Sequence, residues 1–346
     1  MRLGAVLVVV VLALLAALTI WLHRSIPPIG GHETVSGLGA PVEVTWDSLG
    51  VPHITAASDS DALETLGYLH ARDRLWEMET MRRAAEGRLS EILGPAALVA
   101  DQYLRSLDIP YAAWRCERAM APETRSLALA YVRGINGWIA THPRPLGPEF
   151  QLLRFKPGPW TTDQLFEMGR LMAWDLVNAG GELELARAAA KLGPERVKEL
   201  FPSHPDSAAV ILPKGAGHWA AAPAGTGARR QGGTAATVPS ALLSLRDIPA
   251  IPPLAAQLLD AASISRASNS WVIGPARTRS GKPILANDPH LMLRAPSLWY
   301  LAVIESPGYH VAGATIPGLP AVILGHNRRI AWGLTNVGVD DLDYVI

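Results

Sequence analysis

Cysteine, charge imbalance and several common catalytic motifs are missing from this sequence. The one cysteine, Cys116, excludes an intrachain disulfide and a cysteine-rich metal site. Lysine and arginine together number 31, as do aspartate and glutamate, and no basic block occurs, which argues against a nucleic-acid partner. The chain has no G-x-S-x-G, S-x-x-K, H-E-x-x-H, P-loop or G-x-G-x-x-G motif. A serine nucleophile would therefore need a base that none of these motifs supplies.

Charge is absent altogether from residues 4–22, which read GAVLVVVVLALLAALTIWL. As a helix this stretch would span roughly 28 Å, close to the thickness of the hydrocarbon core of a bilayer. A buried core helix is the alternative, but a segment that is apolar all round at the extreme terminus favours an export signal or a signal anchor. No clear A-x-A cleavage site follows it, so retention as an anchor stays open. We expect residues 1–25 to be this signal or anchor, and the rest of the chain to be periplasmic or extracellular.

The region from residue 26 to 212 is predicted to be mostly helical. Residues 42–56 predict two short strands around an Asp-Ser-Leu-Gly turn. Capping-box spacing at Asp61 to Glu64 predicts the start of a helix that ends at Gly94-Pro95, and further helices are expected at 123–141 and 162–193. The apolar face of the first helix consists of Leu75, Met78, Ala85, Leu89 and Ile92. A solvated face with i,i+4 ion pairs is the interpretation of Arg72, Asp73, Arg74, Glu77, Arg82 and Arg83.

A change of composition then separates this helical region from a region rich in strand patterns. Residues 213–267 are rich in Gly, Pro and Ala and are typical of a flexible linker or a removable spacer. From Ser268 the chain consists of short β-type runs, namely NSWVIG, KPILAND, LWYLAVIES, HVAGATI, AVILGHN and IAWGLT. Helices followed by a spacer and then strands predict an α+β fold.

The first of these strand patterns begins with Ser268-Asn269-Ser270. Such a polar cluster is ordinarily a loop that caps or turns the backbone. A serine at a chain terminus, however, carries a nucleophile and a base in one residue, because a free α-amine has a pKa of about 7.7–8.0 and can accept a proton near neutral pH. A cut between Ala267 and Ser268 would create such a terminus and would mark the end of the spacer.

Several stretches in this order resemble the penicillin acylase family of N-terminal-nucleophile hydrolases, which includes acyl-homoserine-lactone, aculeacin and cephalosporin acylases. They are DSLGVPHITA, ALETLGYLHARDRLWEMETMRRAAEGRLSEILGPAAL, LGPEFQLLRFKPGPWT, SNSWVIG, NDPHL, PGLPAVILGHNRRIAWGLTN and VDDLD. The resemblance implies an αββα sandwich, incomplete here. It also implies a helical α-subunit, a removed spacer, and a β-subunit that starts at residue 268. The two subunits would form a heterodimer from one precursor.

The resemblance also assigns roles to single residues. Ser268 would be the nucleophile, with its own α-amine as base through a water, and Ala267 and Asn269 would take part in autoprocessing. His290 matches the histidine near that amine in the acyl-homoserine-lactone, cephalosporin and aculeacin branches, where the penicillin G branch has glutamine; taken alone it would be a turn or packing residue. The oxyanion would be bound by a backbone amide at Asn336 or Val337 and by an asparagine that has no counterpart before Ile346. We therefore expect the chain to be a fragment.

Two further sites follow from the same resemblance. A structural Ca²⁺ would be bound by the side chains of Asp340 and Asp343, the carbonyl of Leu342 and the side chain of Glu182, with Glu184 as the rival, since carboxylate and carbonyl oxygens suit this ion. No organic cofactor is expected. The acyl chain of the substrate would lie among Leu291, Leu298, Ile323, Leu324 and Leu334, which favours fatty-acyl over phenylacetyl groups; the alternative is an ordinary sheet core.

These observations predict an exported, self-processing amidohydrolase that removes an acyl chain from a small amide, such as an acyl-homoserine lactone, a lipopeptide or a β-lactam. The alternative within this class is a β-lactam acylase of antibiotic metabolism. The alternative from another class is an unprocessed scaffold, anchored through residues 4–22, that acts as a binding module.

Overall fold

The computed structural model describes residues 2–142, 147–176, 187–200, 267–291 and 294–336. The chain divides into two units, of which the first combines Met1–Val177 with Ile251–Val339 and the second combines Asn178–Ala250 with Asp340–Ile346. Helix α10 (Pro194–Leu200) belongs to the second unit. All of the other labelled elements belong to the first unit, as do Ser268, His290 and Asn336.

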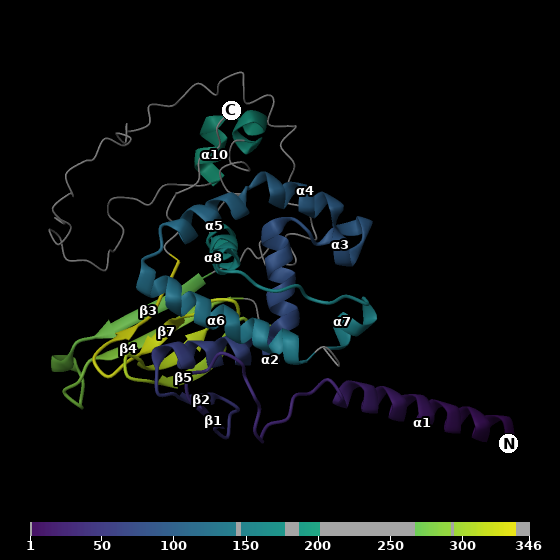
Figure 1. The fold of residues 1–346 in the computed structure, drawn as a ribbon. Helices are drawn as coiled ribbons and strands as arrows, with labels where there is room; N and C mark the ends of the chain where they lie inside the picture. The colour runs from purple at the N-terminus through teal and green to yellow at the C-terminus, as the bar shows by residue number, and fades with distance from the viewer. Residues whose placement is uncertain (1, 143–146, 177–186, 201–266, 292–293, 337–346) are drawn as a thin grey trace. The chain divides into compact units, whose positions relative to one another are not determined.

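The helices of the first unit come before most of its strands (Figure 1). They are α1 (Arg2–His23), α2 (Asp59–Glu86), α3 (Ser90–Leu93), α4 (Leu98–Ser106), α5 (Ile109–Arg118), α6 (Pro122–Thr141), α7 (Pro148–Leu152) and α8 (Thr162–Leu176), with 3-10 turns at Pro95–Ala97 and Pro275–Arg277. The helix expected at 123–141 is confirmed by α6. The helix expected at 162–193 is confirmed by α8 for its first part and by helical residues 187–192, while 177–186 lie outside the described residues.

The strands form two sheets. Strands β1 (Glu43–Trp46), β2 (Pro52–Thr55), β5 (Tyr300–Glu305), β6 (His310–Thr315), β7 (Val322–His326) and β8 (Ala331–Trp332) form one sheet in the order β1-β2-β5-β6-β7-β8. Strands β3 (Ala267–Ile273) and β4 (Ile284–His290) form a separate antiparallel pair. Every β-type run that the sequence predicted from Ser268 onward overlaps one of these strands. The predicted α+β class is confirmed.

One parallel strand pair connects the two halves of the sequence. Strand β2 precedes all the helices of the core and pairs in parallel with β5, with His53 opposite Val303. The hairpin β1–β2 is the one that the sequence predicted, and its turn is held by Asp47, whose Oδ1 accepts hydrogen bonds from the backbone amides of Leu49 (2.8 Å) and Val51 (3.0 Å). The sheet therefore contains strands from both sides of the spacer predicted at 213–267.

The limits of α2 differ from the prediction at both ends. Its N-cap is Ser58, whose hydroxyl accepts from the amide of Asp61 at 3.1 Å, so Asp61 occupies the N3 position and not the N-cap position that the sequence predicted for it. The helix ends at Gly87, which has φ of 61° and ψ of 48°, the left-handed conformation typical of a helix C-terminus. The apolar spacing continues past Gly87 because α3 follows at once, so the sequence pattern predicted one helix up to Gly94 where the structure has two.

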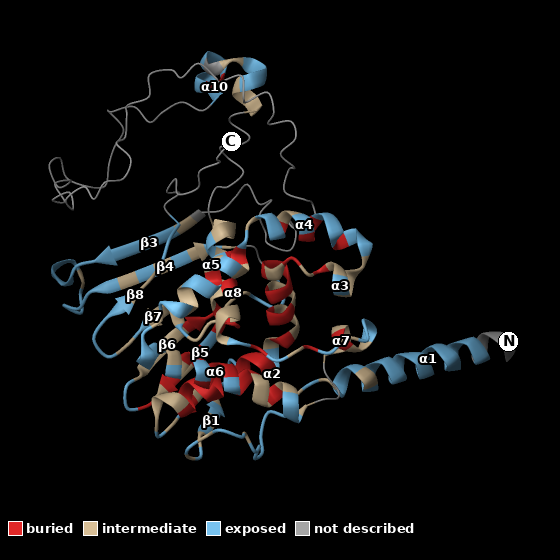
Figure 2. Cartoon of the chain, turned by 45° about the horizontal axis from the view of Figure 1, so that its top comes forward, coloured by how far each residue is buried: buried red, intermediate tan, exposed pale blue. Residues whose placement is uncertain are grey.

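Helices α2 and α6 cross at a glycine. A Cβ atom placed on Gly134 of α6 would lie 1.8 Å from the carbonyl oxygen of Glu64 in α2, so only glycine permits this approach. Both helices supply fully buried side chains to the main core, which also includes residues of α8, β2 and β5. Figure 2 shows the buried residues concentrated along α2 and α6.

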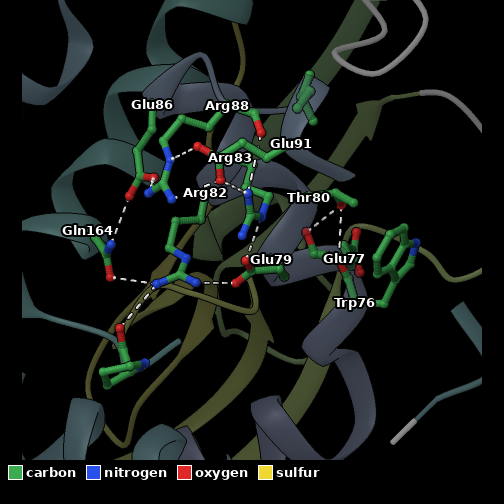
Figure 3. A network of polar contacts seen from close by, with 12 residues as sticks. Trp76, Glu77, Glu79, Thr80, Arg82, Arg83, Glu86, Arg88, Glu91 and Gln164 are labelled. Carbon is green, nitrogen blue, oxygen red and sulfur yellow. Dashed lines mark hydrogen bonds and ion pairs between the residues drawn. The ribbon is translucent and has the colours of Figure 1, made fainter. Parts of the chain in front are cut away.

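The charged face of α2 that the sequence predicted to be solvated is partly buried: Asp73 is exposed, whereas Arg82 and Arg83 are each only 6% exposed. The carboxylate of Glu79 is fully buried and accepts from Arg83 Nε at 2.8 Å and from Arg82 Nη2, as Figure 3 shows. Arg82 also donates to the carbonyl of Pro159 at 3.1 Å and to Gln164 Oε1 at 3.2 Å. Burial raises the pKa of Glu79, while the two arginines lower it. These residues are buried because the segment before α8 packs over them, which helical spacing alone cannot reveal.

A buried chain of hydrogen bonds fixes the helices to the sheet. Thr315 Oγ1 donates to the carbonyl of Tyr300 at 2.6 Å, so it must accept from His70 Nε2 at 2.9 Å. The ring nitrogen Nδ1 of His70 then accepts from the hydroxyl of Tyr131 at 2.6 Å, and that hydroxyl accepts from the amide of Gly318 at 2.9 Å. Burial, and secondarily Arg74, lowers the pKa of His70 to about 3, in keeping with this neutral tautomer.

Helix α1 is exposed from Val6 to Ile20, as the pale blue colour in Figure 2 shows, and Trp21 near its C-terminal end is half-buried. Of the helices in the described residues, this one is long and apolar enough to cross a membrane, over Val6–His23, a test that a signal sequence also passes. Its C-terminal end is joined to α7, because Trp21 Nε1 donates to Gln151 Oε1 at 2.7 Å.

Candidate active site

Ser268 lies near the start of strand β3 and not in a turn. Strand β3 pairs with β4 without interruption, so that Ala267 lies opposite His290, Ser268 opposite Pro289 and Asn269 opposite Asp288. The polar Ser-Asn-Ser cluster is therefore regular strand, and the alternative of an Asx turn at Asn269 does not describe it. The peptide bond between Ala267 and Ser268 belongs to this strand and faces the end of the NDPH motif.

The alternation of side chains places Ser268 and His290 on different faces of this pair. Residues directly opposite one another share a face, so Ser268 shares one with Pro289, and His290 shares the other with Ala267. His290 is half-exposed, and its Nε2 lies 2.7 Å from Asp288 Oδ2. In this conformation the histidine pairs with its own strand and not with the serine. Its predicted place near the amine of Ser268 stays a prediction.

Asn287 makes three hydrogen bonds near Ser268, and no sequence pattern singled it out. Its Nδ2 donates to the carbonyls of Asn269 at 2.9 Å and Leu334 at 3.0 Å, and its Oδ1 accepts from the amide of Leu334 at 3.0 Å. Both amide hydrogens and one acceptor position are used, which fixes the orientation of the side chain. Asn287 lies opposite Ser270 and thus on the same face of the pair as Ser268.

The contact between Asn287 and Leu334 depends on the residue before Leu334. A Cβ atom on Gly333 would lie 2.6 Å from Cβ of Asn287. The segment after β8 can therefore reach β4 only with glycine at this position. Figure 2 shows β4 beside β8, the strand at the edge of the six-stranded sheet, in keeping with the hydrogen bonds between Asn287 and Leu334.

The next residues of this segment reach the end of α8. Asn336 Nδ2 lies 2.5 Å from the carbonyl oxygen of Leu176, the last residue of α8. Asn336, one of the two predicted oxyanion donors, therefore lies at the end of α8 and two residues after Leu334, which contacts β4. The alternative donor, Val337, lies outside the described residues.

The residues predicted to bind the acyl chain lie on several segments, and none of them lines the apolar pocket between α5, α6 and α8. Ile323 and Leu324 are in β7, where the register shifts between Ala314 and Thr315, so that Ile323 is the extra residue of a bulge. A bulge interrupts the alternation of side chains, so these two residues are not forced to opposite faces. Leu291 and Leu298 are half-buried, whereas Leu334 is 56% exposed.

The predicted calcium ligands cannot be placed. Glu182, its rival Glu184, Asp340, Leu342 and Asp343 all lie outside the described residues, as does most of the predicted spacer. Within the described residues, no group of three or more His, Cys, Asp or Glu side chains is arranged to hold a metal ion.

Comparisons with known proteins agree with the motif order. Residues 41–346 match the family model described as penicillin amidase. The acyl-homoserine lactone acylase QuiP of Pseudomonas aeruginosa is 33% identical over 324 residues, which cover 92% of this chain and 36% of that protein. The penicillin acylase 2 proenzyme of Pseudomonas sp. (strain SE83) is 31% identical over 320 residues, covering 92% of this chain and 39% of that protein.

A penicillin G acylase structure from Alcaligenes faecalis matches with a TM-score of 0.43 and 27% identity, over 50% of this chain and 97% of that one. The chain spans somewhat more than a third of the length of the curated relatives that it matches. The family model covers most of the sequence, and the relatives match it almost from end to end at 30% identity or more. The chain therefore belongs to the penicillin amidase family.

Proposed function

We propose that this chain is part of a self-processing acylase whose nucleophile is the hydroxyl of Ser268. The observation that carries the proposal is the placement of Ser268 in a regular strand, one residue after the predicted cut, in a chain of the penicillin amidase family. Oγ of Ser268 would attack the carbonyl carbon of Ala267, and the peptide would become an ester by an N→O acyl shift. Water would then hydrolyse this ester, which leaves a carboxylate on Ala267 and a free α-amine on Ser268.

The mature site would use the same hydroxyl on an external amide. The α-amine would take the hydroxyl proton, the acyl group would pass to Oγ, and the amine of the substrate would leave with that proton. Water would release the acid and regenerate Ser268. A backbone N–H at Asn336 or Val337 would bind the oxyanion, and Asn287 would hold the Ser268 strand against this segment.

We propose a small amide with an aliphatic acyl chain as the substrate. One relative is named an acyl-homoserine lactone acylase and another a penicillin acylase proenzyme, so both substrate classes are represented among the relatives. The aliphatic character of Leu291, Leu298 and Ile323 supports the first, because each methylene that fits such a pocket contributes about 0.8 kcal/mol. The second relative makes a β-lactam acylase, which would remove the acyl chain of a penicillin or cephalosporin, the alternative to be tested.

Export, subunit structure and metal content complete the proposal. The exposed helix α1 supports export through a signal or retention as an anchor, with the remainder of the chain outside the cytoplasm. The two pieces produced by the cut would stay together as a heterodimer. A structural Ca²⁺ held by Asp340, Asp343, the Leu342 carbonyl and Glu182 is proposed on the chemistry of these oxygen ligands.

The processing step is tested by expressing the protein from its full reading frame. We expect two chains, the second starting Ser-Asn-Ser-Trp by N-terminal sequencing, and one uncut chain for Ser268→Ala. Ser270→Ala is the matched control, because it removes the same hydroxyl two residues later on the same face of β3. A single chain from the wild type would support the alternative of a binding scaffold, and a terminus elsewhere would refute Ser268 as nucleophile.

The substrate class is tested on the processed protein. We expect kcat/KM to be higher for an aliphatic acyl-homoserine lactone than for penicillin G, measured side by side. A clear preference for the phenylacetyl group of penicillin G would contradict the aliphatic pocket and favour the β-lactam alternative.

A further inference from the structure

An apolar pocket of about 480 Å³ opens between the helices and the turns of the six-stranded sheet. Leu165, Gly169 and Ala173 of α8 form one wall, residues of α5 and α6 form the second, and Tyr309, Leu319 and Pro320 from the turns beside β6 form the third. None of the residues predicted to bind the acyl chain lines it. Its volume is within the range of about 300–1,000 Å³ that is typical of small-molecule sites.

Four residues with polar groups interrupt the apolar lining of this pocket, namely Cys116, Thr124, Arg170 and Tyr309, and Arg170 is the charged one among them. Arg170 of α8 is exposed, and its Nη2 lies 3.0 Å from Sγ of Cys116 in α5. A thiol is a weak acceptor, and the structure shows no ion pair for Arg170 among the described residues. The neighbouring carboxylate of Glu117 already binds Arg125 and the hydroxyl of Thr162. The guanidinium of Arg170 thus keeps donors that suit a planar anion, and a carboxylate matches them best.

Gly169 leaves space in the pocket wall formed by α8, although the backbone conformation at this position does not require glycine. Gly169 lies inside α8, where glycine is about 1 kcal/mol less favourable than alanine. A Cβ atom at this position would approach nothing closer than Cδ2 of Leu319, at 3.9 Å, which is an ordinary contact. Larger side chains at position 169 would fit the helix but would fill the pocket.

We propose that this pocket binds an amphiphilic monocarboxylate, with its acyl chain among the apolar side chains and its carboxylate on Arg170. The apolar lining supplies the affinity for the chain, and the guanidinium supplies the selection for a single negative charge at one end. This second site goes beyond the proposed acylase function and does not rest on it, because it contains neither Ser268 nor any predicted acyl-binding residue.

Cys116 provides a local readout of occupancy, since it is the one cysteine in this sequence and lines the pocket. A carboxylate on Arg170 would displace the thiol from the guanidinium and cover it. The protein expressed from its full reading frame is treated with N-ethylmaleimide, and alkylation of the Cys116 peptide is followed by mass spectrometry. Octanoate at about ten times its Kd should slow this alkylation about tenfold, because only unoccupied protein reacts. Octanol and octylamine at equal concentration should protect far less.

Substitutions distinguish the contribution of the Arg170 charge to octanoate binding from the contribution of the cavity. Arg170→Gln should abolish protection by octanoate, expressed as the ratio of rates with and without ligand, so that any change in the reactivity of the thiol itself cancels. Arg115→Gln is the matched control, since it removes an exposed arginine beside Cys116 that does not line the pocket. Gly169→Leu should abolish protection without any change of charge.

Three results would overturn the proposal. Octanol protecting as well as octanoate would remove the role of the charge, and protection that survives in Arg170→Gln would do the same. Alkylation that is slow without ligand and insensitive to octanoate would show that a part of the protein itself fills the pocket.

Discussion

Replacing Tyr131 by phenylalanine tests the hydrogen-bond chain between the helices and the sheet. The change removes one hydroxyl, which donates to His70 Nδ1 at 2.6 Å and accepts from the amide of Gly318 at 2.9 Å. The ring stays, and with it the edge-to-face contact with His70 at 5.7 Å between ring centroids. Tyr131 and His70 are fully buried, so water does not replace the lost partner.

The expected loss follows from the two groups left without a partner. A buried donor or acceptor that loses its hydrogen bond costs about 1–3 kcal/mol, and here one donor and one acceptor are affected. We expect the free energy of unfolding to fall by about 2–6 kcal/mol, a large part of the roughly 5–15 kcal/mol that stabilises a typical domain. The loop that contains Gly318 leads into β7, so the effect should reach the strand that carries Ile323.

Urea unfolding of the variant and the wild type measures the change in the free energy of unfolding. Amide hydrogen exchange at Gly318 measures the local loss of protection. Exchange at Gly318 should accelerate in the variant. Tyr111→Phe is the control, because Tyr111 is 55% exposed and its substitution should change stability by less than about 0.5 kcal/mol. Equal stability of Tyr131→Phe and wild type, with unchanged exchange at Gly318, would refute the assignment of donors and acceptors along this chain.

Two further predictions concern the helices. Gly134→Ala should lower the free energy of unfolding in urea by more than about 3 kcal/mol, because the new Cβ would lie 1.8 Å from a backbone oxygen of α2. Gly137→Ala on the same helix is the control: its Cβ would meet nothing closer than 3.8 Å, so this variant should be neutral or stabilising. Equal effects of the two substitutions would contradict the close crossing of α2 and α6. Burial, then Glu86 and Asp163, raises the pKa of Glu167 from 4.5 to about 8. Between these pH values the folded state holds a proton that the unfolded state has released, so stability should fall as pH rises from about 5 to 9. Tm measured across this range should fall less steeply for Glu167→Gln, and parallel curves would contradict the raised pKa.

The strands, helix α6 and the start of α8 were predictable from sequence, whereas both ends of α2 were not. Each strand after residue 267 is a short run with strand composition between turn residues, a signal that is local. The end of α2 carried a signal too, since Gly87 is a typical C-terminal residue, but the apolar spacing that runs through α3 outweighed it. Helices α4 and α5 were missed altogether.

Burial of charge was the larger error, and its cause is tertiary packing. The spacing of Glu79, Arg82 and Arg83 is the same whether the pairs face water or protein, because i,i+3 and i,i+4 pairs form in either case. Whether these pairs face water or protein depends on the segment at the start of α8, about eighty residues later in the chain, which packs over them. For the candidate site, the motifs located the strand that carries Ser268, whereas Asn287 acts through Leu334, a contact that spans 47 residues and that no local pattern encodes.

The pair Asn287 and Gly333 determines where the strand of Ser268 lies. The side-chain amide of Asn287 pairs with both the N–H and the C=O of Leu334, as a neighbouring strand would, and it can do so only while position 333 lacks a Cβ. Strand β3 is therefore placed relative to the predicted oxyanion donor through one side chain rather than through a continuous ladder of backbone hydrogen bonds.

Loss of that side chain should therefore impair processing more than stability. Asn287→Leu keeps the size of the side chain but removes three hydrogen bonds, worth about 0.5–1.5 kcal/mol each and at the lower end here because the site is half-exposed. We expect precursor cleavage at Ser268 to slow, measured as the fraction cut against time. Gly333→Ala should also slow cleavage, because its Cβ would lie 2.6 Å from Cβ of Asn287. In an Asn287→Gly background this Cβ is absent, so Gly333→Ala should slow cleavage less there. Effects that simply add would show that the two residues act independently, and cleavage at the wild-type rate in Asn287→Leu would show that the ladder between β3 and β4 places Ser268 by itself.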